Sequence, residues 1–134
     1  MNDWLLSLQQ WDNARYPDIQ GRFFDPKRSH FGPPHASSTG VYLEGLIDAY
    51  SFASVVGDED RANKYRISIL RGLRSLMQLQ FQDDVDMYYV SKRKMVYGGL
   101  RTNVYNNEIR CDNVQHGLMA VLKILHEFEV SDFI

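Results

Sequence analysis

Apolar residues recur with the helical period in separate stretches of the chain, and these stretches predict helices. The predicted helices cover residues 3–12, 37–56, 58–81 and about 113–129. The second is apolar around most of its circumference, and its narrow polar line consists of Glu44, Asp48 and Ser51. A helix of this kind is buried on more than one side, whereas an ordinary amphipathic pattern places the third helix further out.

The same periodicity predicts which faces of the outer helices are buried. In the third helix, the predicted buried residues are Ala62, Tyr65, Ile69, Leu73 and Leu76. Its predicted solvated residues are Arg61, Lys64, Ser68, Arg71 and Ser75. In the last helix, the predicted core stripe is Val114, Leu118, Val121, Leu122, Leu125 and Phe128. Because Gly57 and Asp58 separate the second helix from the third, we expect the two to form an antiparallel hairpin.

The segments between the helices differ in kind. Residues 13–36 hold all four prolines and are typical of a long, packed loop. Aromatic and β-branched runs at 87–90 and 95–97 flank the polar residues 91–94, which is the pattern of a β-hairpin. Residues 100–111 are largely polar and are predicted to form an irregular segment. The expected fold is therefore mainly α, with about four helices and a small β-hairpin between the third and last helices.

Composition limits the class of protein. A chain of 134 residues with 44% hydrophobic residues predicts one globular domain, 1–134. Its net charge of −2 argues against a nucleic-acid partner. No apolar run is long enough for a membrane span, and no secretory signal is visible, so we expect a cytoplasmic protein that does not enter the membrane. The single cysteine, Cys111, excludes an internal disulfide and a cysteine-based zinc site.

A weak internal repeat runs through the chain. Gln9 and Gln80 each follow a leucine at a predicted helix end, precede an aromatic residue and a long loop, and lie 71 positions apart. Gly45 and Gly117 lie in the helices that follow those loops and are 72 positions apart. The order of outer helix, long loop and inner helix thus occurs twice, which points to a stacked or closed array of helical hairpins.

This organisation resembles the α/α toroid, the architecture of six-hairpin glycosidases, polysaccharide lyases, sugar epimerases and terpene cyclases. The segments 35–46, 98–101 and 109–116 are similar to inner-helix starts in the carbohydrate-acting branch. The resemblance implies a domain that is part of a larger α/α toroid, since a full ring needs about six hairpins and this chain holds roughly two. It also implies a carbohydrate-active or carbohydrate-binding protein that acts on a sugar or uronate, with a truncated enzyme as one form. The partner it implies is a sugar-like small molecule or a polysaccharide. Whether the chain is an enzyme is left open; a glycoside hydrolase, lyase or sugar epimerase activity is what the resemblance implies if it is.

Glu44 and His116 are the candidate catalytic residues. Glu44 lies on the polar line of a buried helix, where a carboxylate needs a partner or a cavity. His116 occupies the place of Glu44 in the repeat, and a histidine there suits acid–base work or hydrogen bonding to a sugar. The alternatives are an ion pair of Glu44 with Arg101 or Arg110, and a structural hydrogen bond from His116 to a loop.

The candidate substrate-binding residues are polar or aromatic side chains near the inner-helix starts. They are His35, Arg101, Tyr105, Arg110 and Asp112. Such side chains bind hydroxyl groups or stack on sugar rings. The alternative is an anchored loop whose arginines bind backbone carbonyls. We expect no cofactor and no metal, because His30, His35, His116 and His126 lack the spacing of a metal site.

Other polar groups favour ordinary structural roles. Asp83, Asp84 and Asp86 suit a capped, solvated turn better than a cation or sugar site, since the pattern of a calcium loop is missing. Cys111 has no histidine neighbour in the sequence, which argues against a nucleophile.

The alternative function is a non-enzymatic helical interaction module. An incomplete ring leaves apolar inner-helix faces that need a partner. We therefore expect a homo-oligomer, for which a dimer that completes part of the ring is one form.

Overall fold

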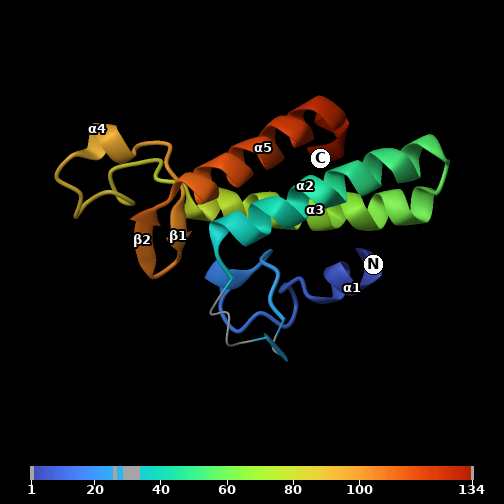
Figure 1. Cartoon of the computed structure of the whole chain (residues 1–134), viewed down its shortest axis with the longest axis horizontal. Coiled ribbons are helices and arrows are strands. Elements are labelled where there is room, and N and C mark those ends of the chain that lie inside the picture. The colour runs from blue at the N-terminus through green and yellow to red at the C-terminus, as the bar shows by residue number, and fades with distance from the viewer. Residues whose placement is uncertain (1, 26, 29–33, 134) are drawn as a thin grey trace.

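The computed structural model describes residues 2–25, 27–28 and 34–133, and these residues are mainly helical (Figure 1). The elements are α1 (Asn2–Ser7), the 3-10 helix η1 (Pro17–Ile19), α2 (Ala36–Val55), α3 (Glu59–Leu79), α4 (Arg93–Val96), β1 (Arg101–Asn103), β2 (Asn106–Ile109), α5 (Cys111–Glu127) and the 3-10 helix η3 (Val130–Phe133). None of the helices in the described part of the chain has both the length and the apolar character that crossing a membrane requires.

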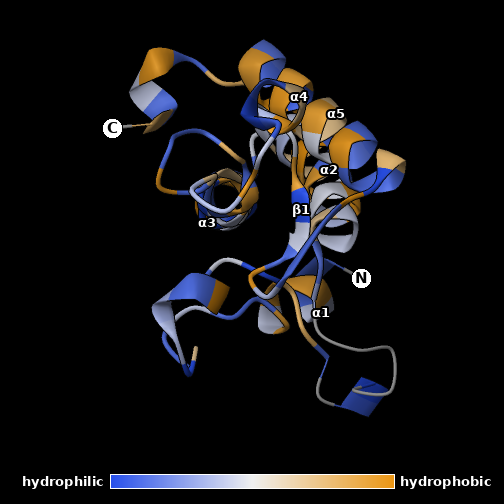
Figure 2. Cartoon of the chain, turned by 90° about the vertical axis from the view of Figure 1, so that its left-hand side faces the viewer, coloured by the Kyte–Doolittle hydropathy of each residue, from blue (hydrophilic) through white to orange (hydrophobic). Residues whose placement is uncertain are grey.

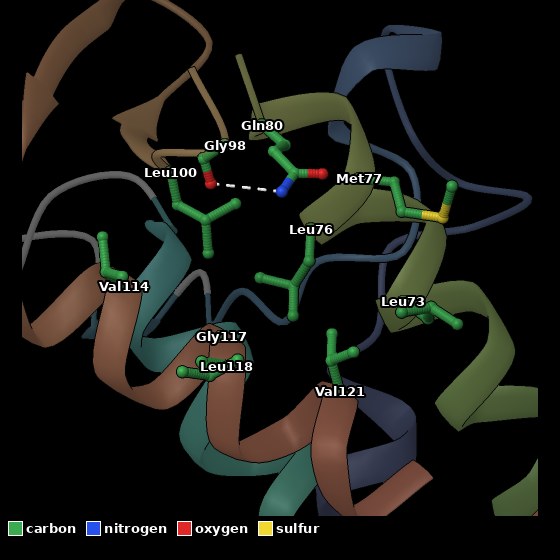
Figure 3. A pocket seen from close by; sticks show the side chains of 10 residues that line it. All are labelled: Leu73, Leu76, Met77, Gln80, Gly98, Leu100, Val114, Gly117, Leu118 and Val121. Atoms are coloured by element: carbon green, nitrogen blue, oxygen red, sulfur yellow. Dashed lines mark hydrogen bonds between the residues drawn. The ribbon is translucent and has the colours of Figure 1, made fainter. Parts of the chain in front are cut away.

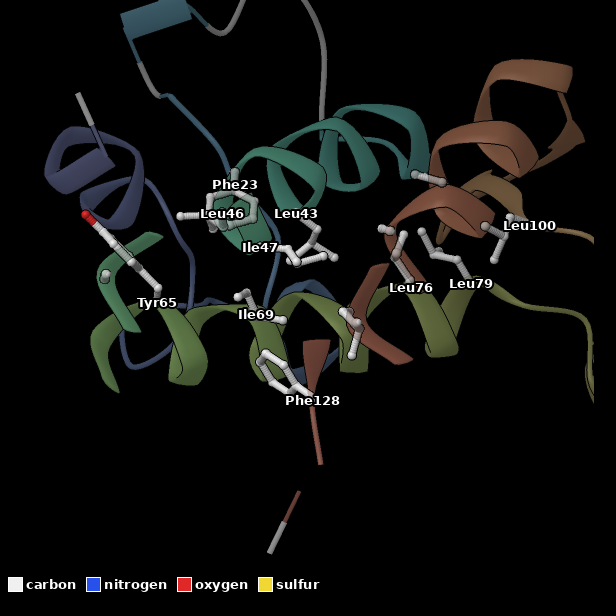
Figure 4. Close-up of a cluster of buried hydrophobic side chains, with 14 residues drawn as sticks. Phe23, Leu43, Leu46, Ile47, Tyr65, Ile69, Leu76, Leu79, Leu100 and Phe128 are labelled. Carbon is white, nitrogen blue, oxygen red and sulfur yellow. The ribbon is translucent and has the colours of Figure 1, made fainter. Parts of the chain in front are cut away.

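Helix α2 is the centre of the fold. It packs against α3 on one side and α5 on another, and these are the largest interfaces in the chain. Its residues Leu43, Leu46 and Ile47 are essentially inaccessible to solvent, and they contribute to a core that includes Ile69 of α3 and Ile124 of α5. Figure 4 shows Leu43 and Ile47 pointing toward the helix that carries Ile69. The prediction that the second helix is buried on more than one side is therefore confirmed.

The predicted antiparallel hairpin of α2 and α3 is also present. Gly57 ends α2 with a φ of 74°, a left-handed conformation that favours glycine. Asp58 caps α3, because its Oδ1 accepts a hydrogen bond from the Arg61 backbone N–H at 3.1 Å. The short connection leaves the two helices side by side (Figure 1).

The first helix is shorter than predicted and ends at Ser7 rather than near residue 12. After Leu8 the chain leaves the helix and pairs with the segment that returns toward α2. The Gln10 N–H donates to the Arg22 carbonyl at 2.7 Å, and the Gly21 N–H donates to the Gln10 carbonyl at 2.7 Å. These bonds take up backbone groups that a continued helix would need for itself.

A two-stranded antiparallel hairpin lies between α3 and α5, as expected, but it is built from other residues. Strands β1 and β2 cover 101–103 and 106–109, which the sequence pattern assigned to an irregular segment. Asn103 closes their turn, since its Oδ1 accepts from the N–H groups of Tyr105 and Asn106 at 3.1 and 2.9 Å. The predicted hairpin over 87–97 is wrong: turns and the short helix α4 occupy it.

Helix α5 buries a different face from the predicted one. Its buried residues are Asn113, Gly117, Ala120 and Ile124. Leu118, Leu122 and Leu125, predicted as core, are 54%, 52% and 66% exposed. The small residues determine which face is buried, because Gly117 and Ala120 let α5 approach its neighbours closely. The leucines project away from α2, and no helix among the described residues covers them.

The predicted solvated face of α3 is also partly wrong. Ser68 and Ser75 are buried, because the N-terminal segment covers this side of the helix. Gln9 Nε2 donates to the Ser68 carbonyl at 2.9 Å, and Arg22 Nε donates to Ser75 Oγ at 3.2 Å. Burial lowers the pKa of the Arg22 guanidinium, although Asp18 opposes that shift.

The repeat seen in the sequence reappears in the backbone pairing. Gln9 forms an isolated antiparallel bridge with Phe23, and Gln80 forms the same kind of bridge with Leu100. In each case the chain leaves an outer helix, runs through a loop and returns to pair before it enters an inner helix.

The glutamine side chains repeat as well. Gln9 Nε2 donates to the Gly21 carbonyl at 3.1 Å, and Gln80 Nε2 donates to the Gly98 carbonyl at 3.1 Å. Both glycines have positive φ, 91° and 81°. The described part of the chain therefore contains two units of the same construction: α1 with α2, and α3 with α5.

Candidate functional site

The first turns of α2 and α5 meet at the same end of the helical layer. Gly40 of α2 permits the contact, because a Cβ on this residue would lie 2.7 Å from the His116 carbonyl carbon and 2.9 Å from its oxygen. The two helices belong to different repeat units, so the contact brings equivalent parts of the repeat together.

Asn113 joins these helix ends to the β-hairpin and is 1% exposed. Its Oδ1 accepts from the Ser37 N–H of α2 at 3.2 Å, and its Nδ2 donates to Thr102 Oγ1 of β1 at 2.9 Å. Thr102 Oγ1 in turn donates to the Glu108 carbonyl of β2 at 2.9 Å. This chain of hydrogen bonds fixes both helix starts relative to the hairpin.

Glu44 and His116, the two candidate catalytic residues, contact each other. Glu44 Oε1 lies 2.9 Å from His116 Nδ1, and both side chains are about one-quarter to one-third exposed, at 24% and 30%. Because a carboxylate only accepts hydrogen bonds, the Nδ1 atom carries the hydrogen in this contact. The Nε2 atom then stays available, since it makes no other hydrogen bond among the described residues.

The ion pairs considered for Glu44 in the sequence are not the ones formed. Arg101 instead donates to the Gln78 carbonyl at 3.0 Å and lies 3.6 Å from Asp86. Arg110 pairs with Asp112 at 3.0 and 3.1 Å. Glu44 is therefore left to orient the imidazole of His116.

A shallow pocket of about 220 Å³ opens beside His116. Its lining residues are His35, Ser37, Ser38, Val41, Tyr42, Asp112 and His116. Three of the predicted site residues, His35, Asp112 and His116, thus share one cavity. Glu44 does not line it and reaches it only through His116.

His35 has two roles at this place. It precedes α2 as its N-cap, and its backbone N–H donates to Ser38 Oγ at 3.4 Å. Its Nδ1 lies 2.8 Å from Ser37 Oγ. These contacts hold the imidazole at the pocket wall. They also give the backbone N–H group that precedes α2 a hydrogen-bond acceptor.

Asp112 brings a carboxylate to the pocket. The hydrogen bonds from Arg110 lower the pKa of this carboxyl group, so it is ionised at neutral pH. The Asp112 side chain is open to solvent, and it has acceptor capacity beyond its two contacts with Arg110.

Arg101 and Tyr105 lie outside the pocket. Tyr105 is 69% exposed at the tip of the β-hairpin. Arg101 donates to the Gln78 carbonyl, which is the anchoring role considered as an alternative in the sequence. Its guanidinium also packs over the Phe81 ring at 5.4 Å from the centroid.

Sequence reasoning missed Ser37, Ser38 and Tyr42 as pocket residues. The two serines were recognised only as possible helix caps. Their position as capping residues could have indicated this role, because the start of the helix is where the two units meet.

The acidic cluster of Asp83, Asp84 and Asp86 forms a capped turn. Asp83 Oδ1 accepts from the N–H groups of Val85 and Asp86 at 2.8 and 3.0 Å, and Asp84 pairs with Arg93 at 2.6 Å. Within the described ranges, no group of three or more potential metal ligands is present.

A second and larger cavity, of about 330 Å³, lies between α3 and α5. Figure 3 shows Leu73, Leu76 and Met77 on one wall and Val114, Leu118 and Val121 on the other. It is apolar except for Gln80, whose side chain bonds to the Gly98 carbonyl at one end. A groove of this kind suits an apolar partner and not a sugar.

Comparison of the chain with family models, with curated proteins and with solved structures finds no match.

Proposed function

We propose that the pocket at the first turns of α2 and α5 binds a sugar or uronate. The observation that carries this proposal is the convergence of His35, Asp112 and His116 from both repeat units on one cavity, with Glu44 behind His116. These groups supply both donors and acceptors to hydroxyl groups, which is what recognition of a polyol requires.

Each group has a role in this proposal. The Asp112 carboxylate accepts hydrogen bonds from sugar hydroxyls. Arg110 binds Asp112 through Nε and Nη2, so its Nη1 group is the one that donates to a uronate carboxylate. Tyr42 offers an aromatic surface at the edge of the pocket. The volume of about 220 Å³ lies below the roughly 300–1,000 Å³ of typical small-molecule sites, so we expect a single ring to enter.

If the chain is catalytic, His116 is the acid–base residue and Glu44 is its positioning residue. The carboxylate fixes the imidazole so that Nε2 faces away from it, toward a substrate. This arrangement suits proton transfer at a sugar carbon or hydroxyl, as in lyases and epimerases. We further propose that the two repeat units are part of a larger α/α toroid and that the chain works in the cytoplasm, where the exposed free thiol of Cys111 stays reduced.

A thermal-shift panel tests the sugar proposal. It contains neutral monosaccharides, uronates, oligosaccharides, divalent metal ions and isoprenoid diphosphates. We expect one sugar class to raise the melting temperature and His116→Ala to abolish that rise. His126→Ala is the matched control, because this histidine is on the same helix but its side chain is 84% exposed. No shift for any sugar, or an equal shift in His116→Ala, contradicts the proposal.

A second candidate is a non-enzymatic interaction module that associates through open helix faces. The observation that favours it is the exposure of Leu118, Leu122 and Leu125 next to the apolar cavity. Exposed apolar side chains that adjoin one another mark an interaction site in soluble proteins. This candidate requires a chain that associates in solution, which sedimentation measures directly.

A further inference from the structure

The open face of α5 corresponds to the face of α2 that the core buries. Adding the 72-residue offset of the repeat to three α2 residues gives the three exposed leucines. The equivalent pairs are Leu46 with Leu118, Tyr50 with Leu122 and Ala53 with Leu125. On α2 these positions are covered by α3, and Leu46 and Ala53 are 0% and 4% exposed. On α5 nothing in the described chain takes the place of α3. Figure 2 shows orange, hydrophobic residues recurring along α5.

The outer helix of the first unit has no inner helix of a preceding unit to pack on among the described residues. An outer helix packs mainly on the inner helix of the preceding unit, since α3 packs on α2 and scarcely contacts α5. Helix α1 is the outer helix of the first unit and makes only a small contact with its own inner helix, α2. Its Trp4 is 50% exposed. Leu5 and Leu8 are only partly buried, whereas their equivalents 71 residues later, Leu76 and Leu79, are 2% and 0% exposed.

The inner helix of the first unit has an open face as well. The residues that α5 buries correspond, through the offset of 72, to a line of exposed positions on α2. These pairs are Val41 with Asn113, Gly45 with Gly117, Asp48 with Ala120 and Phe52 with Ile124. Val41 and Phe52 are 44% and 69% exposed, and a Cβ on Gly45 would meet nothing within 4 Å.

We propose that two copies of this chain associate head to tail, with the first unit of one copy packed on the second unit of the other. Helix α1 of one copy then fills the apolar cavity between α3 and α5 of its neighbour, as α3 covers α2 within the chain. The open face of α2 packs on α5 of that neighbour, as α5 packs on α2. The contact is heterologous, because different surfaces of the two copies meet. This inference rests on the second candidate function and specifies its partner and geometry.

The charges of the inner helices agree with this arrangement. Inside the chain, Glu44 of α2 contacts His116 of α5 at 2.9 Å. The same offset relates these two residues to each other, so continuing the repeat brings Glu44 of the second copy next to His116 of the first. A carboxylate and an imidazole thus face each other across the boundary, as they do within the chain.

Complementary blocking variants test the proposal. Gly45→Lys places a charge on the open face of α2 and leaves α5 intact, and the open space around Gly45 makes the change compatible with folding. Leu118→Lys places a charge at the α3–α5 cavity and leaves α2 intact. Met95→Lys, at a side chain that is 78% exposed on α4, is the control for loss of an exposed apolar group. Circular dichroism confirms that each variant is folded before sedimentation velocity measures its association.

We expect the wild type and Met95→Lys to associate, each blocked variant alone to be restricted to monomer, and an equimolar mixture of the two blocked variants to form a one-to-one dimer. The mixture tests the geometry of the contact. Only in a heterologous contact can the intact first unit of Leu118→Lys pack on the intact second unit of Gly45→Lys. A mixture that stays monomeric, or blocked variants that associate alone as the wild type does, overturns head-to-tail packing while association through some other face survives. A monomeric wild type overturns both this inference and the second candidate function.

Discussion

Gly21→Ala is expected to destabilise the protein more than any other single-methyl change. Gly21 has a φ of 91°, and a Cβ there would lie 2.0 Å from the Arg71 carbonyl oxygen of α3. The conformation costs about 1–2 kcal/mol for a residue with a Cβ, and the overlap with rigid backbone adds about 1–3 kcal/mol. Urea unfolding monitored by circular dichroism should therefore show a free energy of unfolding lowered by about 2–5 kcal/mol.

The repeat supplies the matched control for this change. Gly98 takes the same place in the second unit, with a φ of 81°, but a Cβ there would meet nothing within 4 Å. Gly98→Ala should lower the free energy of unfolding by only about 1–2 kcal/mol, the cost of the backbone conformation alone. Equal losses in the two variants would show that the N-terminal segment does not pack against α3 as described.

Gly40→Ala is expected to have the second-largest effect, because it acts at the contact between the inner helices. Its Cβ would lie 2.7 Å from the His116 carbonyl carbon, and backbone atoms cannot rotate away as a side chain does. Helix α5 must shift, which strains the hydrogen bonds of Asn113 and the contact of Glu44 with His116. We expect a loss of about 1–3 kcal/mol in the free energy of unfolding, measured by urea titration.

Gly45→Ala is the control on the same helix, and its expected effect has the opposite sign. Gly45 faces open space, so an added methyl group meets no neighbour. Replacing glycine by alanine inside a helix stabilises by up to about 1 kcal/mol. A stable Gly40→Ala variant, or a Gly45→Ala variant that loses stability to the same extent, would contradict the close approach of α2 and α5.

The sequence predicted the long helices because their periodicity is determined locally. The bounds of α2 and α3 agree with the apolar pattern and with the Gly57–Asp58 signal between them. The hairpin was assigned to the wrong residues because the aromatic residues near 87–97 gave the stronger strand pattern. The true turn depends on hydrogen bonds to Asn103, which the sequence pattern does not reveal. The buried face of α5 was also misassigned, since the close contact selects Gly117 and Ala120 over the larger leucines.

The site was predictable to the extent that the repeat determines it. The polar line of the second helix indicated Glu44, the repeat then indicated His116, and the structure brings the two residues into contact at 2.9 Å. The roles of Arg101 and Tyr105 depended on how the hairpin folds, and it directs neither residue to the pocket. No local pattern reveals that Ser37 and Asn113 are linked, because they are 76 residues apart.

We propose that the two repeat units share one ligand pocket at the first turns of α2 and α5. The most direct test is a titration of the ¹⁵N-labelled chain with the stabilising sugar, followed by two-dimensional amide NMR. We expect the shifted amides to lie in both units, at Ser37 and Ser38 of α2 and at Asp112 and His116 of α5, and we expect the amide signals along the α3–α5 groove to stay unchanged. Shifts confined to one unit, or centred on the groove, would contradict this proposal.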